Sequence, residues 1–180
     1  MPELRTDRLL LRQWQDSDLE PWAAMNADPE VRRHLGALLT REESDAGVAL
    51  MRAEFGERGF GWWALEVRES GEFVGRAGLD VVMEGLPYTG VDVGWRLTRS
   101  AWGNGYATEA ARACLDFGFG TLGLREIVAS TTVHNLRSQA VMRRLGMTRD
   151  PADDFEDPSV PEGPLRRCVL YRTGDVRPGC

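Results

Sequence analysis

The chain has 180 residues, which suits one α/β domain of ordinary size. Its 28 acidic and 22 basic side chains give a formal charge of −6, so no overall positive field exists to hold a nucleic acid. All 22 basic residues are arginine. The absence of lysine excludes a Walker A phosphate loop, a pyridoxal phosphate Schiff base and any lysine nucleophile.

Apolar residues make up 42% of the chain, yet no apolar run approaches the roughly 18–20 residues of a membrane-spanning helix, and the start lacks a secretion signal. Cys114, Cys168 and Cys180 are widely spaced and form no CxxC pair. We therefore expect a cytoplasmic protein that binds neither membrane nor nucleic acid. His34 and His134 lie far apart in the sequence, so we expect no metal site.

The first half of the chain alternates short apolar runs with helix-capping residues. Thr40 and Glu43 have the spacing of a capping box, which predicts that a helix begins there. The expected elements are a strand at 8–14, a helix at 19–25, a helical turn at 28–34, a helix that ends near Gly56 or Gly59, and two strands at 62–68 and 73–82 joined by a hairpin turn. Trp62 and Trp63 should face opposite sides of their strand.

The second half begins with a strand at 91–97, in which Val93 and Leu97 share one face and Asp92 and Arg96 the other. A helix with an apolar face follows Gly103, and further elements are a strand at 126–132, a helix from 135 to 146 and a strand at 165–172. Between them lies an acidic, proline-rich loop at 150–164, which either favours a cationic acceptor or is simply solvated. The order predicts a mixed α/β layer with a central hairpin meander, formed by residues 1–180 as one domain.

The most informative segment is the turn between the strand at 91–97 and the following helix. It reads Gly-Asn-Gly-Tyr-Ala-Thr over residues 103–108. The first amides of a helix lack intrahelical partners and carry partial positive charge, and glycine lets a phosphate approach the backbone closely. The alternative is that the two glycines only close a tight connection. A dinucleotide fingerprint needs a glycine where Thr108 stands, although Glu126 lies at a suitable distance to bind a ribose.

The segments WGNGYATEAA, residues 102–111, and HNLRSQAVMRRLGM, residues 134–147, resemble the acetyl-CoA-binding core of the GNAT acetyltransferases. The ends of the chain, LRTDRLLLRQWQDSD and DFEDPSVPEG followed by LRRCVLYR, are similar to those of the RimJ/RimL-type branch, the ribosomal-protein N-terminal acetyltransferases. The resemblance covers essentially the whole chain. It implies the α/β GNAT fold, a mixed and mostly antiparallel central sheet with splayed fourth and fifth strands, flanked by helices.

In that family a Q/R-x-x-G-x-G/A loop holds the CoA pyrophosphate through backbone amides. It maps here onto residues 102–107, with Trp102 in place of Gln or Arg. The resemblance also implies that residues 97–99 pair with the pantetheine and that Asn135 contacts the cofactor, although Asn is equally a favoured helix N-cap. The residues expected to bind acetyl-CoA are Leu97, Thr98, Arg99, Gly103, Asn104, Gly105, Tyr106, Ala107, Thr108 and Asn135.

Acetyl transfer to an amine needs a proton acceptor for the amine, a hydrogen bond to the developing oxyanion and a proton for the leaving thiolate. Backbone amides near Trp95 and Leu97 are expected to supply the oxyanion contact. Asp92 is the candidate base, where some relatives place an acidic residue; the alternative is a solvated strand residue or a water chain. Many relatives use as acid a tyrosine at the position of Met142, which cannot donate.

Ser138 is the candidate acid, because the N-terminal acetyltransferases are thought to use a serine three residues after the helix-opening Asn. The alternative is that Ser138 only belongs to the capping turn, and Tyr88, Tyr106 and Tyr171 are weaker candidates. The resemblance predicts an acetyl-CoA-dependent N-acetyltransferase whose acceptor is the amine of a protein or peptide N-terminus. A small amine, such as an amino acid or antibiotic, and a non-catalytic acyl-CoA-binding module remain alternatives. Homodimers are common among similar proteins.

Overall fold

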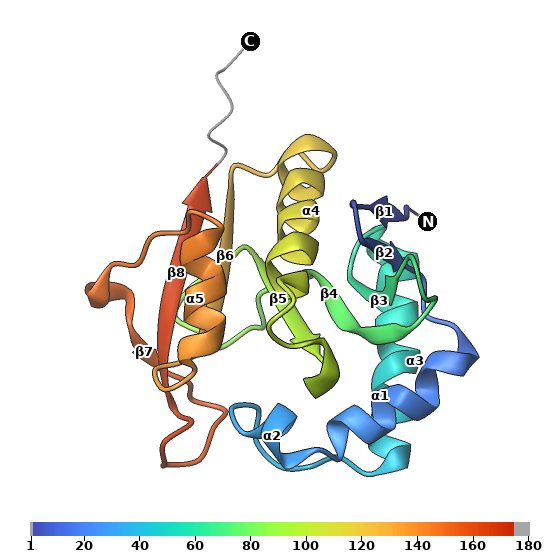
Figure 1. Cartoon of the computed structure of the whole chain (residues 1–180). Coiled ribbons are helices and arrows are strands. Elements are labelled where there is room, and N and C mark those ends of the chain that lie inside the picture. The colour runs from blue at the N-terminus through green and yellow to red at the C-terminus, as the bar shows by residue number, and fades with distance from the viewer. Residues whose placement is uncertain (1, 175–180) are drawn as a thin grey trace.

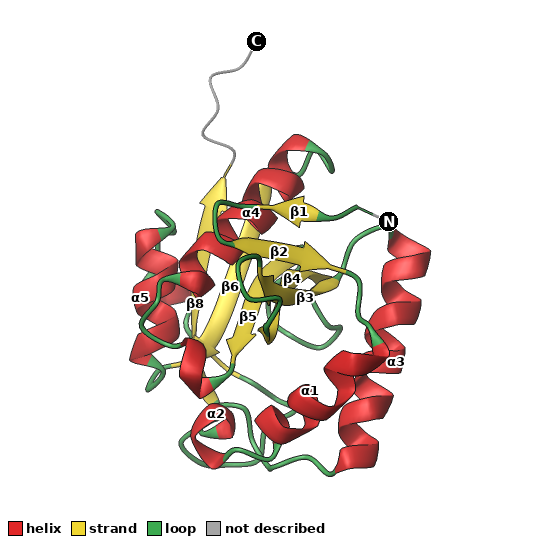
Figure 2. Ribbon diagram, turned by 45° about the vertical axis from the view of Figure 1, so that its right-hand side comes forward, coloured by secondary structure: helices red, strands yellow, loops and turns green. Residues whose placement is uncertain are grey.

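The computed structural model describes residues 2–174, which form one eight-stranded sheet with helices on both faces (Figures 1 and 2). The strand order is β1-β2-β3-β4-β5-β6-β8-β7, and every neighbouring pair is antiparallel except β5 and β6, which are parallel. The strands are β1 (Leu4–Arg5), β2 (Leu9–Arg12), β3 (Trp62–Val67), β4 (Phe73–Val81), β5 (Val91–Leu97), β6 (Glu126–Thr132), β7 (Phe155–Glu156) and β8 (Arg167–Gly174). The α-helices are α1 (Leu19–Asn26), α2 (Pro29–Arg32), α3 (Arg41–Arg58), α4 (Tyr106–Gly120) and α5 (Leu136–Arg144).

The predicted elements are all present, with ends that differ by a few residues. The capping box before α3 forms as expected: the Glu43 amide donates to Thr40 Oγ1, and the Glu43 carboxylate accepts from the Thr40 amide. The helix ends at Gly59, which has the left-handed φ of 75° that favours glycine at this position. The sequence did not predict the two-residue strands β1 and β7, which lie at the two edges of the sheet.

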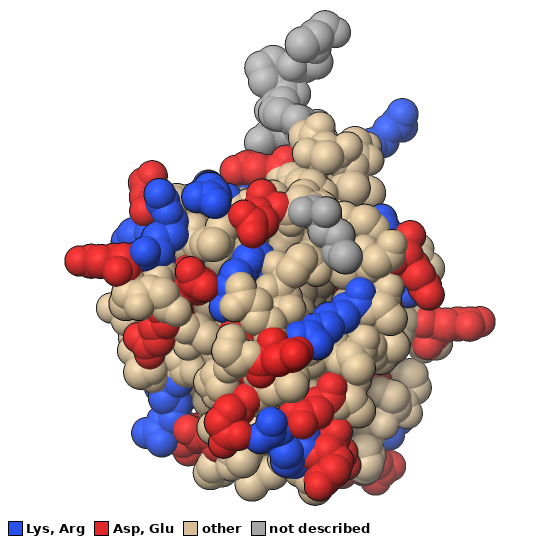
Figure 3. All heavy atoms as spheres, turned by 90° about the vertical axis from the view of Figure 1, so that its right-hand side faces the viewer, with Lys and Arg blue, Asp and Glu red and all other residues tan. Residues whose placement is uncertain are grey.

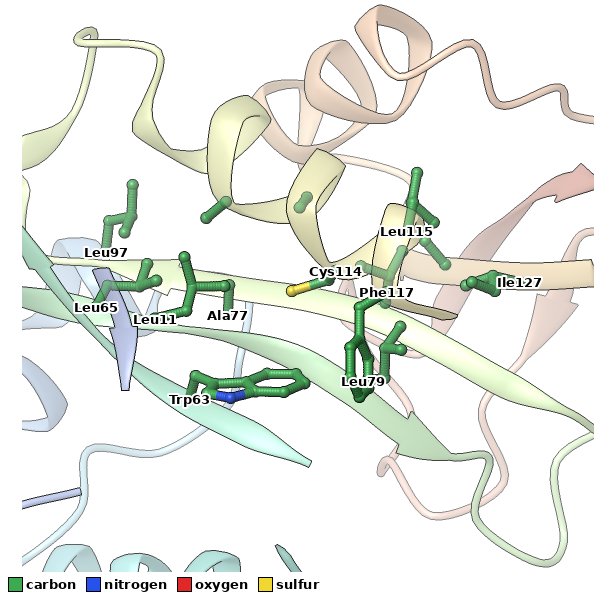
Figure 4. Packing of buried hydrophobic residues seen from close by; sticks show 14 of the residues in the cluster. Leu11, Trp63, Leu65, Ala77, Leu79, Leu97, Cys114, Leu115, Phe117 and Ile127 are labelled. Atoms are coloured by element: carbon green, nitrogen blue, oxygen red, sulfur yellow. The ribbon is translucent and has the colours of Figure 1, made fainter. Parts of the chain in front are cut away.

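One face of the sheet packs against α4 and forms the larger part of the core. Figure 4 shows Cys114 and Phe117 of this helix above Trp63 and Leu79 of the strands. The Phe117 and Trp63 rings meet edge to face with centroids 5.4 Å apart. Cys114 is fully buried, and burial raises the pKa of its thiol, so it acts here as a small apolar residue.

The opposite face is covered by α1 and α3, the blue and cyan helices at the lower right of Figure 1. Trp22 and Val48 from these helices pack on Ala64, and the ring of Trp62 lies on this side. The prediction that Trp62 and Trp63 face opposite sides is therefore confirmed. On the side of the molecule in Figure 3, acidic and basic side chains are intermingled. No helix among residues 2–174 has the length and apolar character needed to cross a membrane.

Strands β5 and β6 separate along their length, which positions the site described below. Their only matched residues within the described chain are Asp92 and Val128. The Thr98 amide donates to the Val74 carbonyl on β4. Because hydrogen-bonding directions alternate along an antiparallel pair, the amides of Trp95 and Leu97 point to the opposite edge, toward β6. Those amides therefore face an edge where β6 no longer pairs in register.

Candidate active site

The glycine turn adopts the backbone that its sequence predicts. Gly103 and Gly105 have φ of 82° and 81°, and Gly105 is the N-cap of α4. The first bond across this turn joins the Glu109 amide to the Gly105 carbonyl. The amides of residues 106–108 therefore have no partner within the helix and are available to an anion. A Cβ at Gly103 would meet no atom within 4 Å, so the backbone angle, not crowding, requires glycine there.

Contacts from Arg8, near the N-terminal end of the chain, hold this turn in place. The sequence analysis did not predict these contacts. Arg8 Nη1 donates to the Asn104 carbonyl at 2.9 Å, and its guanidinium lies 4.8 Å from the Tyr106 ring centroid. Arg8 also binds the Glu109 carboxylate, which accepts further bonds from the Arg8 amide and Thr6 Oγ1. These bonds lower the pKa of Glu109 against the opposing effect of burial. Glu109 thus fixes the first turn of α4 to the turn between β1 and β2.

Trp102, which stands where the family usually has Gln or Arg, ties the turn to β5. Its Nε1 donates to the Leu97 carbonyl at 3.0 Å. On the other side, the Arg137 guanidinium lies 4.5 Å from the Trp102 ring centroid. Because Leu97 belongs to β5 and Arg137 to α5, the indole links β5 with the helix that follows β6. This contact could not be predicted from the sequence, which gives no sign that residues 102 and 137 meet.

Asn135 and Ser138 form the first turn of α5. Asn135 Oδ1 accepts a bond from the Ser138 amide, which confirms that Asn135 is the N-cap. Its Nδ2 donates to Thr131 Oγ1 at 2.9 Å and to Ser138 Oγ at 3.0 Å, so both amide hydrogens are used. The Ser138 oxygen is therefore an acceptor here, which leaves its hydroxyl hydrogen for another group. Met142, at the position where many relatives have a tyrosine, is buried.

Asp92 lies where β5 and β6 begin to separate. Burial raises the pKa of its carboxyl to about 7, and the negative charge of Asp80 adds to this shift, while the Arg76 guanidinium opposes it. Asp80 itself accepts bonds from Trp62 Nε1 at 3.0 Å and from Arg58 at 2.9 Å. A carboxyl group with this pKa can accept and release a proton near neutral pH.

Trp62 and Tyr88 lie around Asp92, and the sequence analysis named Tyr88 only as a weaker candidate acid. A Cβ on Gly94 would lie 2.6 Å from Trp62 Cη2, so the indole rests directly on the glycine backbone between Asp92 and the end of β5. Tyr88 donates to Ser130 Oγ at 2.8 Å, and the Asp92 charge contributes to raising the pKa of Tyr88 after the larger effect of burial. These residues come from three separate segments, and no motif links them.

The described surface has a cleft of about 630 Å³ beside α1 and the end of β5. It is lined by Thr98 and Arg99, two of the residues expected to bind acetyl-CoA, and by Met25 and Asp28 from the α1–α2 region. Asp92 does not line it. At the far end of β6, Thr132 Oγ1 lies 3.5 Å from His34 Nδ1. Within residues 2–174, no group of three His, Cys, Asp or Glu side chains is arranged to hold a metal ion.

Comparison with known proteins agrees with this geometry. The family described as an acetyltransferase (GNAT) domain matches residues 8–148. An uncharacterized protein of Bacillus subtilis, YkkB, is 33% identical over 148 residues, which cover 81% of this chain and 84% of the relative. An FsC-acetyl coenzyme A-N(2)-transacetylase of Aspergillus fumigatus is 31% identical over 184 residues, which cover 93% of this chain and 76% of the relative.

Solved structures show the same fold. An acetyltransferase from Agrobacterium tumefaciens superposes with a TM-score of 0.78 at 29% identity, covering 96% of this chain and 94% of that one. RimL, a ribosomal L7/L12 alpha-N-protein acetyltransferase in complex with coenzyme A, superposes with a TM-score of 0.76 at 16% identity. The match covers 96% of this chain and 98% of RimL. The chain belongs to the GNAT acetyltransferase family. It is an acetyl-CoA-dependent N-acetyltransferase, and its sheet is the mixed, mostly antiparallel sheet of that fold.

Proposed function

We propose that this enzyme transfers the acetyl group of acetyl-CoA directly to a primary amine, with the N-terminal amine of a protein or peptide as the first-choice acceptor. The observation that carries this proposal is the arrangement along β5. The amides of Trp95 and Leu97 point to an edge that β6 leaves unpaired, and Asp92, with its raised pKa, lies at the start of the same strand. A thioester held along this edge would have hydrogen-bond donors for its carbonyl oxygen and a base nearby.

The residues at the two ends of this edge would bind acetyl-CoA. The free amides of residues 106–108, following the left-handed glycines Gly103 and Gly105, fit a pyrophosphate, because they combine unpaired donors with the positive end of the α4 dipole. Residues 97–99 would pair with the pantetheine amides as an added strand. Asn104 would help to shape the turn, and Asn135 would act mainly by starting α5, since its amide hydrogens are already used.

Asp92 would take the proton from the incoming ammonium group. The neutral amine nitrogen then attacks the thioester carbonyl carbon and a C–N bond forms. The nitrogen releases a second proton to solvent, and the negative charge that develops on the carbonyl oxygen is held by backbone amides of β5. Asp92 suits this role because a base is most effective when its pKa lies near the working pH. Its protonated form loses the proton to solvent between turnovers.

Ser138 would supply a proton to the leaving sulfur as the C–S bond breaks. A thiol has a pKa of about 8.5 in water, so a hydrogen bond is enough to stabilise the departing thiolate until it is protonated. The hydroxyl of Ser138 is suited to donate, because its oxygen already accepts from Asn135 Nδ2 and this polarises the O–H group. Solvent restores the proton to the serine.

The alternative acceptor is a small amine. The name of the Aspergillus relative describes an N(2)-transacetylase, whereas RimL is described as acting on a ribosomal protein, so similar chains bear names of both kinds. A peptide N-terminus remains our first choice, because the resemblance of the chain ends to the RimJ/RimL-type branch supports it. A catalytically silent acyl-CoA-binding module is the third reading, since Met142 replaces the usual tyrosine.

Release of CoA thiol, measured with a panel of peptides, amino acids and other small amines, distinguishes these readings. The proposal predicts that peptides with free N-termini give the highest kcat/KM, and that the same peptides with blocked N-termini give only background hydrolysis. A small amine that exceeds every peptide would replace the acceptor class. Binding of acetyl-CoA without thiol release by any amine would instead contradict the enzymatic role.

A further inference from the structure

Three arginine side chains converge beside the sheet face that α1 and α3 cover. Arg76 on β4 and Arg96 on β5 stand directly opposite each other in the antiparallel register, and Arg32 is the last residue of α2. Their charges interact: Arg76 and Arg32 help to lower the pKa of Arg96, and Arg32 helps to lower that of Arg76, in each case after the larger effect of burial. Burial likewise lowers the pKa of Arg76 and of Arg32.

None of these three guanidinium groups forms an ion pair with a carboxylate of the described chain. Arg96 donates to Asn26 Oδ1 at 2.7 Å, and Arg32 donates to the carbonyls of residues 35 and 37. Arg76 contacts the sulfur of Met51, and its buried Nε has no hydrogen-bond partner within residues 2–174. Buried donors without partners are rare in folded proteins and require an explanation.

Arg12 shows what a fully compensated buried arginine looks like in the same protein. Its guanidinium binds both oxygens of Asp18, at 2.7 and 2.8 Å, and its Nε binds Glu66 at 2.7 Å. These two carboxylates raise the pKa of Arg12, whereas the surroundings of Arg76 and Arg96 lower theirs. The chain therefore gives Arg12 direct ion pairs, whereas within residues 2–174 Arg76 and Arg96 form none, and Asp80 and Asp92 act on Arg76 only without direct contact.

Like charges that face each other across two strands destabilise a sheet. Aromatic rings relieve part of this repulsion: the Arg76 guanidinium lies 4.0 Å from the Trp62 ring centroid, and Trp22 lies beneath both arginines at 5.4 and 5.2 Å. The remaining positive charge is unopposed by any ion pair. Because both side chains keep part of their surface exposed, an anion from solution can reach them.

The position of this pair relates it to the proposed reaction. Arg96 and Asp92 lie on the same face of β5, on either side of Gly94, and each is two residues from it. Side chains four residues apart in a strand are roughly 13 Å apart along it, and the Trp62 indole covers Gly94 between these two. The charge of Arg76 on the neighbouring strand does act on Asp92, since it opposes the rise in the pKa of that carboxyl. An acceptor whose amine lies near Asp92 can therefore direct a second functional group across the Trp62 ring toward the Arg76 guanidinium, which lies over that ring.

We propose that Arg76 and Arg96 bind the carboxylate of the acceptor, so that this enzyme prefers amines that carry a carboxylate a few bonds from the amino group. Guanidinium groups bind carboxylates through two parallel hydrogen bonds, and an anion shared by both would offset their mutual repulsion. The inference rests on the proposed function, because it concerns the acceptor of the same reaction. The carboxylate can belong to a free amino acid or to an acidic residue at a peptide N-terminus.

Matched pairs of acceptors test the proposal and separate these two sources. L-Phenylalanine and 2-phenylethylamine differ only in the carboxylate, and the peptide amides Asp-Ala-Ala and Asn-Ala-Ala differ only in the side-chain charge. We expect the anionic member of at least one pair to have a kcat/KM about 30-fold higher or more, as for a charge-assisted hydrogen bond. The pair that shows the preference identifies the source of the carboxylate.

Variants then assign the preference to the arginines. Arg96→Gln is expected to reduce the ratio within the preferred pair at least about tenfold, Arg96→Lys to retain part of it, and the exposed Arg125→Gln to leave it unchanged. Thermal melting shows whether the variants fold. Without ligand, Arg96→Gln should melt within about 3 °C of the wild type, whereas Arg12→Gln, which leaves two carboxylates unpaired, should melt much lower.

The outcomes distinguish failure of this inference from failure of the proposed function. Equal kcat/KM within both pairs, with thiol release above hydrolysis, overturns the carboxylate site and leaves the acetyltransfer intact. If no amine raises thiol release, the melting temperature decides instead. N-Acetyl-L-phenylalanine, but not N-acetyl-2-phenylethylamine, should then raise the melting temperature of the wild type and not that of Arg96→Gln; an equal effect of both compounds, or none, overturns the site.

Discussion

Asp92 combines a position at the separation of β5 and β6 with surroundings that favour its neutral form. The groups that act on it are the Asp80 carboxylate, which disfavours a second negative charge, and the Arg76 guanidinium, which partly offsets this. Burial is the largest contribution and raises the pKa to about 7. At lower pH the carboxyl is protonated and cannot accept a proton from the amine.

We therefore predict that kcat/KM, expressed per concentration of protonated amine, rises with pH and levels off above about pH 7. Asp92→Asn should lower kcat/KM by about 10²–10⁴-fold and remove this limb of the profile. Asp116→Asn, on the exposed side of α4, is the matched control and should leave the profile unchanged. A profile of Asp92→Asn that keeps the limb near pH 7 would assign the base to another group or to water.

Ser138 is the proposed acid, and its neighbours permit a specific prediction. Replacing it with alanine removes the hydroxyl and one acceptor for Asn135 Nδ2, but keeps the backbone bond that caps α5. We expect Ser138→Ala to lower kcat by about 10²-fold with little change in the KM for acetyl-CoA. Asn135→Ala should instead weaken cofactor binding or lower the melting temperature, since it removes the cap. An unchanged kcat in Ser138→Ala removes this serine from the mechanism.

The turn between β5 and α4 is the element on which cofactor binding depends. Gly103 has a φ of 82° with open space where a Cβ would lie, so alanine there meets backbone strain and no collision. We predict that Gly103→Ala raises the KM for acetyl-CoA about 5-fold or more, because the turn shifts to relieve the strain, while kcat changes little. Gly123→Ala, with φ of 66° and equally open space before β6, is the matched control and should cost stability without raising this KM.

At the scale of elements, local signals in the sequence predicted most of the fold. The Thr40–Glu43 capping box, the left-handed Gly59 and the alternation along β5 each depend on neighbours in the chain, and each is present in the structure. The edge strands β1 and β7 were missed, because two residues are too few for a periodic pattern and their pairing depends on a distant partner.

The features of the candidate site also fall into two groups: those that local motifs predict, and those that depend on residues far apart in the chain. The glycine turn and the Asn135 cap are local and were recognised as motifs. The bond from Arg8 to Asn104 and the contact between Trp102 and Arg137 join residues that are far apart in the chain. Nothing in the sequence around each residue indicates its partner. The convergence of Arg32, Arg76 and Arg96 is of this kind too, because the three residues come from α2, β4 and β5.

For the whole molecule, the net charge of −6 suggested a cationic acceptor, and the distribution of charge does not support that suggestion. Three of the six acidic side chains of the 150–164 loop are already paired with arginines of this chain: Asp153 with Arg172, Asp154 with Arg149, and Glu156 with Arg166. Within residues 2–174, the Arg76 and Arg96 guanidinium groups on the face of β4 and β5 form no ion pair.

The raised pKa of Asp92 also makes the stability of the whole molecule depend on pH. Its ordinary pKa of 3.8 rises to about 7 in the folded chain, so between these values the folded state binds more protons than the unfolded state. Stability from this group is complete below about pH 4 and is lost as pH rises through about 7. Relative to Asp92→Asn, the wild type should lose about 2 kcal/mol between pH 5 and 8, or roughly 4–8 °C in melting temperature. Parallel melting curves across this range would contradict the pKa assignment.

The central claim is that this chain catalyses transfer of an acetyl group from acetyl-CoA to an amine. The most direct test is to follow CoA thiol release and, by mass spectrometry, the N-acetylated product in the same reaction, with and without an amine. We predict release that requires the amine and yields one acetylated product per thiol, and that is lost in Asp92→Asn. Tight binding of acetyl-CoA with no amine-dependent release would contradict the claim and leave a protein that binds the thioester without using it.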